Sequence, residues 1–151
     1  MSRGVVALPN PGFTEHKHAW SAAGHRVVEY RNLDELAALM AAGDIRYAVV
    51  INPNNPSAEQ ASPVQLLEWR EQLAARDGLL VVDEAFADCF LRLSLAAHVH
   101  LSNLVILRSL GKFFGLAGAR LGFVLASPAI LTQLRRWCNP WQINHPAQWI
   151  G

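Results

Sequence analysis

The sequence predicts an α/β fold with a mostly parallel sheet and helices on both of its faces. Short runs of apolar and β-branched residues alternate with stretches of helical periodicity, and glycine, proline and asparagine separate them clearly. Residues 79–82 are apolar at every position, as in a strand buried on both faces. Strands that alternate with helices in this way are typical of crossover connections between parallel strands.

The first half of the chain contains three expected strands and two expected helices. The strands are residues 4–8, 26–30 and 46–51. A helix is expected over residues 13–23, with Ala19, Trp20 and Ala23 on one face and Gly24 at its end. The second helix begins after Asn32, a residue type that caps helices, and ends at Gly43.

The second half continues the same alternation. Ser62 followed by Pro63 and Gln65 indicates a capped helix start, and Gly78 closes that helix. The remaining expected strands are residues 79–82, 103–107 and 121–125, and a last helix is expected from residue 128 to about residue 137. The chain has no internal repeat and no low-complexity tract.

Length and composition limit the possible functions. The 151 residues make about one domain, and 52% hydrophobic residues with 17% charged residues exclude a disordered chain. The net charge of +1 gives no electrostatic basis for binding nucleic acid or a membrane surface. Two cysteines and six scattered histidines lack the spacing of metal ligands, so no metal is expected. Without a secretory signal or an apolar run near the roughly 18 residues of a membrane span, a cytoplasmic protein is expected.

Three polar motifs follow expected strands, at the edge where open α/β sheets bind ligands. The first contains Asn55, within the sequence NPNNP at residues 52–56. Its two prolines restrict the backbone, so a rigid loop could direct an asparagine amide at a ligand. The alternative interpretation is a turn that only ends the strand.

The second motif is the acid pair Asp83 and Glu84, directly after the apolar strand. A carboxylate at the end of a buried strand needs a positive or donor partner, which predicts a cationic ligand group at Asp83. Alternatively, the carboxylate caps the next segment. An acid pair here also resembles the magnesium box of nucleoside triphosphatases, but the phosphate loop GxxxxGK[ST] that such an enzyme needs upstream is absent.

The third motif runs from Ser109 through Lys112 to Arg120. Lys112 is one of only two lysines, and its neighbours are leucine, phenylalanine and glycine. These surroundings predict a poorly solvated, nucleophilic amine. The alternative is a lysine on a solvated face, which is the more common place for this residue type.

Together, the three motifs resemble those of the fold type I pyridoxal-phosphate enzymes, in the class I/II aminotransferase family. That family has an NPxNP loop, an aspartate after a strand, and SxxK with an arginine eight residues beyond the lysine. The motifs occur here in the same order, and the resemblance covers essentially the whole chain. It implies that residues 1–138 are a central fragment of the family's large domain, and that residues 139–151 begin the connection toward a small C-terminal domain.

The resemblance also implies a role for each site residue. Lys112 would hold pyridoxal 5'-phosphate as a Schiff base and move protons at the reacting carbon. Asp83 would pair with the pyridine nitrogen of the cofactor, and Asn55 would donate to the ring hydroxyl. Ser109 and Arg120 would hold the cofactor phosphate.

Within the family, the chain is most similar to a branch that decarboxylates L-threonine O-phosphate in cobalamin biosynthesis. This similarity rests on the three motifs, on Glu15-His16 and Trp20 in the early helix, and on Asn139-Pro140-Trp141. This resemblance implies a small phosphorylated amino-acid substrate and a homodimer for the full-length enzyme. Two alternatives remain open: an aminotransferase of the histidinol-phosphate type, and a non-catalytic module that retains the motifs.

Several features depart from the family pattern or lie outside this chain. Phe86 stands where the histidinol-phosphate branch usually has a tyrosine, and Gly111 stands where it has a hydroxyl residue. A glycine-rich phosphate cup and an aromatic residue that stacks on the cofactor ring are expected before Met1, and an arginine that binds the substrate carboxylate is expected after Gly151. The tryptophans of the last segment are expected to pack against the rest of the enzyme or in a dimer surface; they are Trp137, Trp141 and Trp149.

Overall fold

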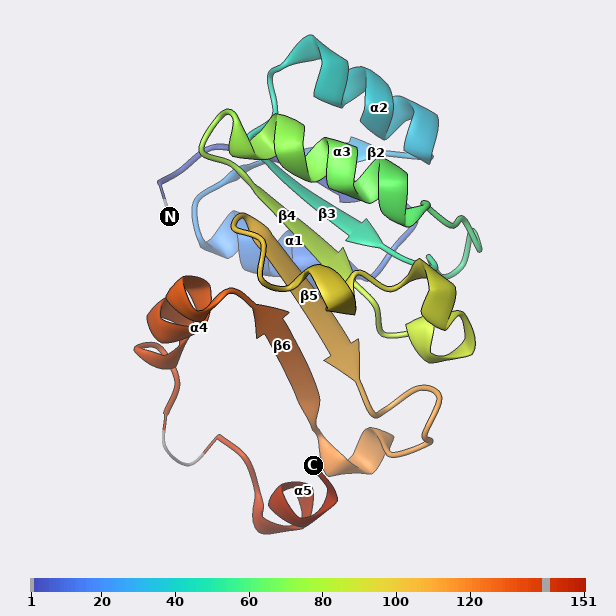
Figure 1. Ribbon diagram of the computed structural model, residues 1–151, viewed down its shortest axis with the longest axis vertical. Helices are drawn as coiled ribbons and strands as arrows, with labels where there is room; N and C mark the ends of the chain where they lie inside the picture. The colour runs from blue at the N-terminus through green and yellow to red at the C-terminus, as the bar shows by residue number, and fades with distance from the viewer. Residues whose placement is uncertain (1, 140–141) are drawn as a thin grey trace.

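The computed structural model describes residues 2–139 and 142–151, which form six strands in one sheet of order β2-β1-β3-β4-β5-β6 (Figure 1). The strands are β1 (Val5–Pro9), β2 (Arg26–Tyr30), β3 (Tyr47–Ile51), β4 (Leu79–Asp83), β5 (Leu104–Ser109) and β6 (Gly122–Ala126). The first five are parallel, and β6 pairs antiparallel with β5. The expected α/β fold with a mostly parallel sheet is confirmed.

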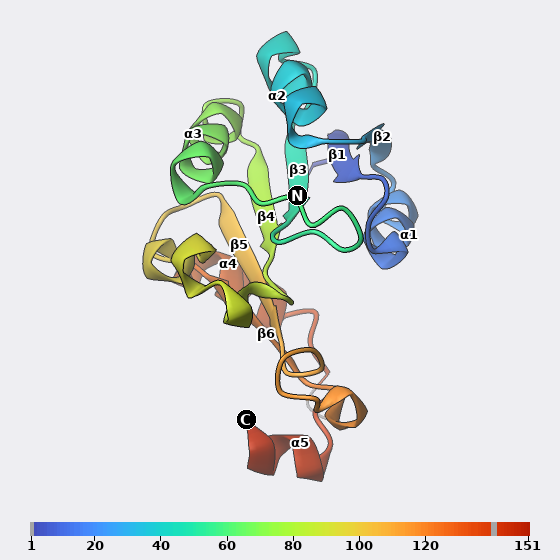
Figure 2. The same cartoon turned by 90° about the vertical axis from the view of Figure 1, so that its right-hand side faces the viewer.

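Helices cover both faces of this sheet, as Figure 2 shows from the side, and the last helix lies below it. They are α1 (Thr14–Ala22), α2 (Leu33–Ala42), α3 (Pro63–Ala74), α4 (Pro128–Arg135) and α5 (His145–Ile150). Four short 3-10 segments are η1 (Ala87–Cys89), η2 (Leu91–Leu93), η3 (Ala96–His98) and η4 (Ala117–Ala119). None of the helices within the described residues is long and apolar enough to cross a membrane.

Two apolar clusters, one on each face, form the core. On one face, α2 and α3 bury Leu36, Met40 and Leu73 against the sheet. On the other face, Trp20 of α1 and Ile130 of α4 pack against a second cluster of strand residues. The central strands β3 and β4 are buried on both faces, which explains their continuous apolar sequence.

Three predicted helix caps are confirmed, whereas α3 ends at Ala74, four residues before the predicted Gly78. The Asn32 side chain accepts a hydrogen bond from the backbone N–H of Glu35 at 2.9 Å, and Ser62 accepts one from Gln65 at 3.2 Å. Gly43 ends α2 with a φ of 82°, in the left-handed region that favours glycine.

The differences from the expected elements lie mainly in the second half. The last predicted helix ends at Arg135 rather than near residue 137, and the 3-10 segments and α5 were not predicted. The segment between β4 and β5 has no regular periodicity, because its path follows hydrogen bonds to Glu84 rather than a repeating apolar face. Pro140 and Trp141 of the expected Asn-Pro-Trp motif lie outside the described residues.

Candidate functional site

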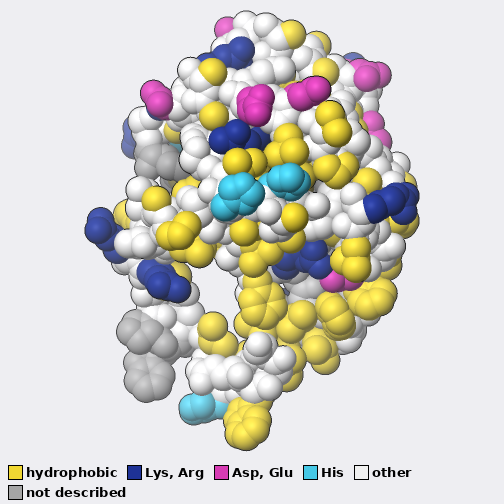
Figure 3. Space-filling view, in the orientation of Figure 1, with side chains coloured by type: hydrophobic (Ala, Val, Ile, Leu, Met, Phe, Trp, Pro, Cys, Tyr) yellow, Lys and Arg dark blue, Asp and Glu magenta, His cyan; other side chains and the backbone are white. Residues whose placement is uncertain are grey.

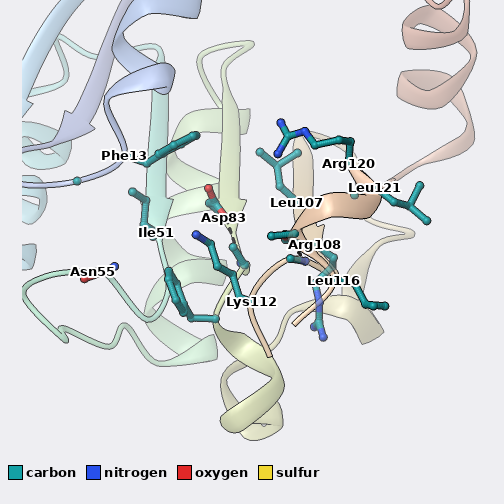
Figure 4. A pocket seen from close by; sticks show the side chains of 17 residues that line it. Phe13, Ile51, Asn55, Asp83, Leu107, Arg108, Lys112, Leu116, Arg120 and Leu121 are labelled. Atoms are coloured by element: carbon teal, nitrogen blue, oxygen red, sulfur yellow. Dashed lines mark hydrogen bonds between the residues drawn. The ribbon is translucent and has the colours of Figure 1, made fainter. Parts of the chain in front are cut away.

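A pocket of about 620 Å³ lies at the edge of the sheet where the parallel strands end (Figure 4). The structure brings all five predicted site residues into its wall: Asn55, Asp83, Ser109, Lys112 and Arg120. Its volume falls in the range of pockets that bind cofactors and other small molecules.

The strand register explains why these residues meet. Ile51 of β3 pairs with Asp83 of β4, and Asp83 pairs with Leu107 of β5. The loops that carry Asn55 and Ser109 therefore begin on either side of Asp83. This arrangement follows from parallel pairing, because it places the carboxyl ends of neighbouring strands at one edge of the sheet.

Asp83 is the most buried of the five residues, with 9% of its surface exposed. One carboxylate oxygen, Oδ2, lies 2.8 Å from Nε2 of His16, and the other accepts a hydrogen bond from the backbone N–H of Ala85 at 3.0 Å. The carboxylate thus contacts the His16 imidazole and caps the next segment, as the alternative interpretation proposed, and the cationic ligand group at Asp83 stays a prediction. Both contacts restrict its rotation.

Lys112 is exposed, so the expected poorly solvated amine is wrong. The reason is the path of the loop after β5, in which Phe113 and Phe114 are 58% and 51% exposed and do not surround the amine. Figure 3 shows hydrophobic side chains gathered on this part of the surface. The Lys112 Nζ atom lies 5.3 Å from the centre of the Phe86 ring, and Figure 4 shows the amine directed toward Asp83.

Ser109 and Arg120 lie at the two ends of the loop that carries Lys112. The Ser109 hydroxyl accepts a hydrogen bond from the backbone N–H of Gly111 at 3.1 Å. Arg120 has a φ of 54°, an uncommon value for a non-glycine residue, at the end of η4. A Cβ atom on Gly111 would lie 3.2 Å from the Cα of Ala117, so a hydroxyl residue at this position would require a small shift of the loop.

In the asparagine loop after β3, two side chains hold the loop in place and a third lines the pocket. Asn52 makes two hydrogen bonds with the backbone of Ala61, at 3.0 Å and 2.9 Å, and Asn54 donates to the backbone oxygen of Pro11 at 3.0 Å. Asn55 is exposed and lines the pocket. Figure 4 shows Asn55 and Arg120 on opposite sides of Asp83 and Lys112.

Phe13 and His16 belong to the site, although the sequence analysis did not select them for it. Phe13 lines the pocket and meets the ring of His16 edge to face, with the ring centres 5.6 Å apart. Their position in the sequence could have indicated this, because both residues lie in the first loop and helix after β1, and β1 is the neighbour of β3 in the sheet. The sequence analysis expected the ring-facing aromatic before Met1, whereas Phe13 supplies an aromatic side chain to the pocket from within the chain.

The family comparison agrees with this geometry. The profile of the family described as "Aminotransferase class I and II" matches residues 2–151. The chain belongs to this family. Its relatives in this family are enzymes. The chain is 43% identical to a threonine-phosphate decarboxylase of Pseudomonas aeruginosa over 148 residues, which are 98% of this chain and 44% of that protein.

Members with another activity are also similar to the chain. A histidinol-phosphate aminotransferase of Baumannia cicadellinicola is 36% identical over 103 residues, which are 68% of this chain and 28% of that protein. The chain thus spans less than half of the length of these curated family members.

Solved structures of the family share the fold. The L-threonine-O-3-phosphate decarboxylase of Porphyromonas gingivalis matches with a TM-score of 0.84 at 22% identity, over 95% of this chain and 44% of that one. A histidinol-phosphate aminotransferase of Sinorhizobium meliloti, solved in complex with pyridoxal-5'-phosphate, matches with a TM-score of 0.81 at 22% identity, over 94% and 41%. The expected cofactor, pyridoxal phosphate, is thereby confirmed as that of the family.

Proposed function

We propose that this chain supplies the cofactor-binding residues of a pyridoxal-phosphate enzyme that decarboxylates L-threonine O-phosphate to an aminopropanol phosphate in cobalamin biosynthesis. The observation that carries the proposal is a single pocket that collects an amine, a buried carboxylate, an amide, a hydroxyl and a guanidinium. The 43% identity to the Pseudomonas aeruginosa decarboxylase supports this substrate.

The residues in the pocket fit the functional groups of pyridoxal phosphate. The Lys112 amine can bind the cofactor aldehyde, and the buried Asp83 carboxylate can pair with the ring nitrogen. The Asn55 amide can donate to the ring hydroxyl. Ser109 and Arg120 offer a hydroxyl and a charged fork to the phosphate. When bound, the cofactor supplies an electron sink for the bond that breaks at the Cα atom of the substrate.

Three protein side chains have further roles in the proposed reaction. Asp83, which His16 contacts at 2.8 Å, would pair with the ring nitrogen of the cofactor and so favour the protonated form of that nitrogen. Lys112 delivers the proton that replaces the departing carbon dioxide at Cα. The ring of Phe86, 5.3 Å from the amine, provides a surface along which the lysine side chain lies.

The proposal extends to the complete enzyme and to its location. Residues 1–138 form the central part of a large domain, residues 139–151 lead toward a small domain, and the enzyme is a cytoplasmic homodimer. The exposure of Trp137 and Trp149, at 87% and 91%, supports a further packing surface at this end of the chain.

Covalent trapping tests the cofactor assignment. The intact protein is incubated with pyridoxal 5'-phosphate, reduced with borohydride and analysed by peptide mass spectrometry. We expect one labelled site, Lys112, and no label in Lys112→Ala. Lys17→Ala is the matched control because Lys17 is the only other lysine and its side chain is exposed on α1. Label retained in Lys112→Ala, or absent from the unsubstituted protein, would contradict the assignment.

An aminotransferase is the second candidate, because histidinol-phosphate aminotransferases at up to 36% identity share the same chain region. The residues of the pocket serve either reaction, since a lysine amine moves the proton in both. Release of carbon dioxide from L-threonine O-phosphate without any keto acid supports the decarboxylase. Amino transfer from histidinol phosphate to a keto acid, with no carbon dioxide released, supports the aminotransferase, and loss of both activities supports the non-catalytic alternative.

A further inference from the structure

Glu84 is a fully buried carboxylate with no role in the chemistry proposed above. It is 0% exposed and follows directly after Asp83 at the end of β4. Its Oε1 atom accepts a hydrogen bond from the backbone N–H of Leu95 at 2.7 Å, and Oε2 accepts one from the Ser94 hydroxyl at 2.6 Å. Arg108 of β5 donates to the same Oε2 atom at 3.0 Å. Both carboxylate oxygens are thus hydrogen-bonded, which offsets the cost of burying the charge.

The Arg108 guanidinium connects three segments of the chain. Its Nη1 atom bonds Glu84 at the end of β4, and its Nη2 atom bonds Oδ1 of Asp88 in η1 at 2.5 Å. The Arg108 side chain is only 18% exposed, and Figure 4 shows it directed away from Asp83 and Lys112. Arg108 therefore joins the strand ends from behind the functional groups of the pocket.

The position of this ion pair relative to the pocket follows from strand geometry. Successive side chains of a strand point to opposite faces, so Glu84 and Arg108 face away from the side used by Asp83 and Ser109. The backbone N–H of Glu84 donates to the oxygen of Leu107 at 2.8 Å. This bond places the Glu84–Arg108 pair on the opposite side of the backbone from Asp83 and Ser109. A change in the Glu84–Arg108 separation must therefore also move Asp83 relative to Ser109.

We propose that the buried Glu84–Arg108 ion pair is a positioning element that sets the separation of Asp83 from Ser109, so that the ring end and the phosphate end of one ligand are held at the same time. This inference rests on the proposed function, in which pyridoxal phosphate occupies the pocket. Arg108 belongs to the pocket wall, but its guanidinium is engaged by Glu84 and Asp88, so the pair acts through the sequence neighbours Asp83 and Ser109.

Stability alone does not explain charges at these positions. A buried ion pair is often no more stabilising than apolar side chains of similar volume, because desolvation offsets the attraction. A guanidinium fork bound to two carboxylates instead gives a directional contact that defines the angle and distance between its partners. Such definition matters at a site in which small misplacements lower activity and binding steeply.

The test compares two ligands that differ only in the phosphate group. Dissociation constants for pyridoxal 5'-phosphate and for pyridoxal are measured by absorbance titration of the intact protein, and their ratio reports how well the phosphate and ring contacts form together. We expect Glu84→Gln and Arg108→Lys to reduce the preference for the phosphorylated ligand about tenfold or more. A purely structural loss would weaken both ligands equally and leave the ratio unchanged.

The matched control is Glu35→Gln, which removes the carboxylate of the exposed Arg31–Glu35 pair at the start of α2. Its ratio should equal that of the unsubstituted protein. If Glu84→Gln does not fold, Arg108→Lys decides, because it keeps the positive charge and removes only the fork. An unchanged ratio in the folded variants overturns the inference while leaving the proposed function intact. No binding of either ligand by the unsubstituted protein overturns both.

Discussion

Two adjacent carboxylates at the end of β4 act on opposite sides of the sheet. Asp83 lines the pocket and bonds His16, whereas Glu84 is buried on the other side and bonds Arg108. The sequence predicts a ligand role for Asp83 alone and gives no role to Glu84. Their separation follows from the alternation of side chains along an extended strand. The structure places Asp83 in the pocket, as predicted, and shows that Glu84 contributes to the opposite face.

Tyr30 provides a test of burial at the residue scale. Burial raises the pKa of its hydroxyl above the ordinary value of 10.0, and the charge of Glu59 adds to the shift. The folded protein retains this proton when the unfolded chain has lost it, so the stabilisation is present below pH 10 and is lost as the pH rises further.

The substitution Tyr30→Phe removes this dependence. Between about pH 10 and pH 11, the free energy of unfolding of the unsubstituted protein should fall by about 1 kcal/mol more than that of Tyr30→Phe. Urea unfolding at a series of pH values measures the difference. Parallel pH profiles for the two proteins would contradict the expected role of Tyr30.

At the element scale, local signals in the sequence decide where helices begin and end. Asn32, Gly43 and Ser62 occupy the predicted cap positions of α2 and α3. Each works through atoms within a few residues of itself, so no knowledge of the tertiary structure is needed to recognise it. The segment between β4 and β5 lacks such signals, since its contacts to Glu84 join residues ten or more positions apart.

The Asn32 cap has a measurable contribution to stability. Asn32→Ala removes the acceptor of the 2.9 Å bond from the Glu35 N–H and should lower the free energy of unfolding by about 1 kcal/mol. Asn32→Asp is the control, because an aspartate keeps an acceptor oxygen in the same position. Urea unfolding of both variants tests this expectation, and equal losses in the two would show that the cap bond is not responsible.

At the scale of the whole molecule, the order of the strands creates the pocket. β3, β4 and β5 are neighbours in the sheet, and β1 lies beside β3, so the loops that follow these strands meet at one edge. The same order brings Gly78, at the start of β4, against the backbone of Arg46, at the start of β3. A Cβ atom on Gly78 would lie 2.0 Å from the Arg46 oxygen.

The substitution Gly78→Ala tests this close approach of two strands. We expect a loss of about 3 kcal/mol in the free energy of unfolding, because backbone atoms must move to admit the methyl group. Gly118→Ala is the matched control, since nothing lies within 4 Å of a Cβ atom at that position. Thermal and urea unfolding provide the measurement. Similar stabilities for the two variants would contradict the packing described here.

The sequence by itself determined the alternation of strands and helices, several of the helix caps, and five polar residues of the pocket wall. These features depend on local periodicity and on short motifs, both of which are contained in neighbouring residues. The antiparallel direction of β6, the exposure of Lys112, the bond from His16 to Asp83 and the pairing of Glu84 with Arg108 were decided only by the tertiary structure. The physical reason is that each of these depends on which distant segments become neighbours and on which face of the sheet a side chain lies.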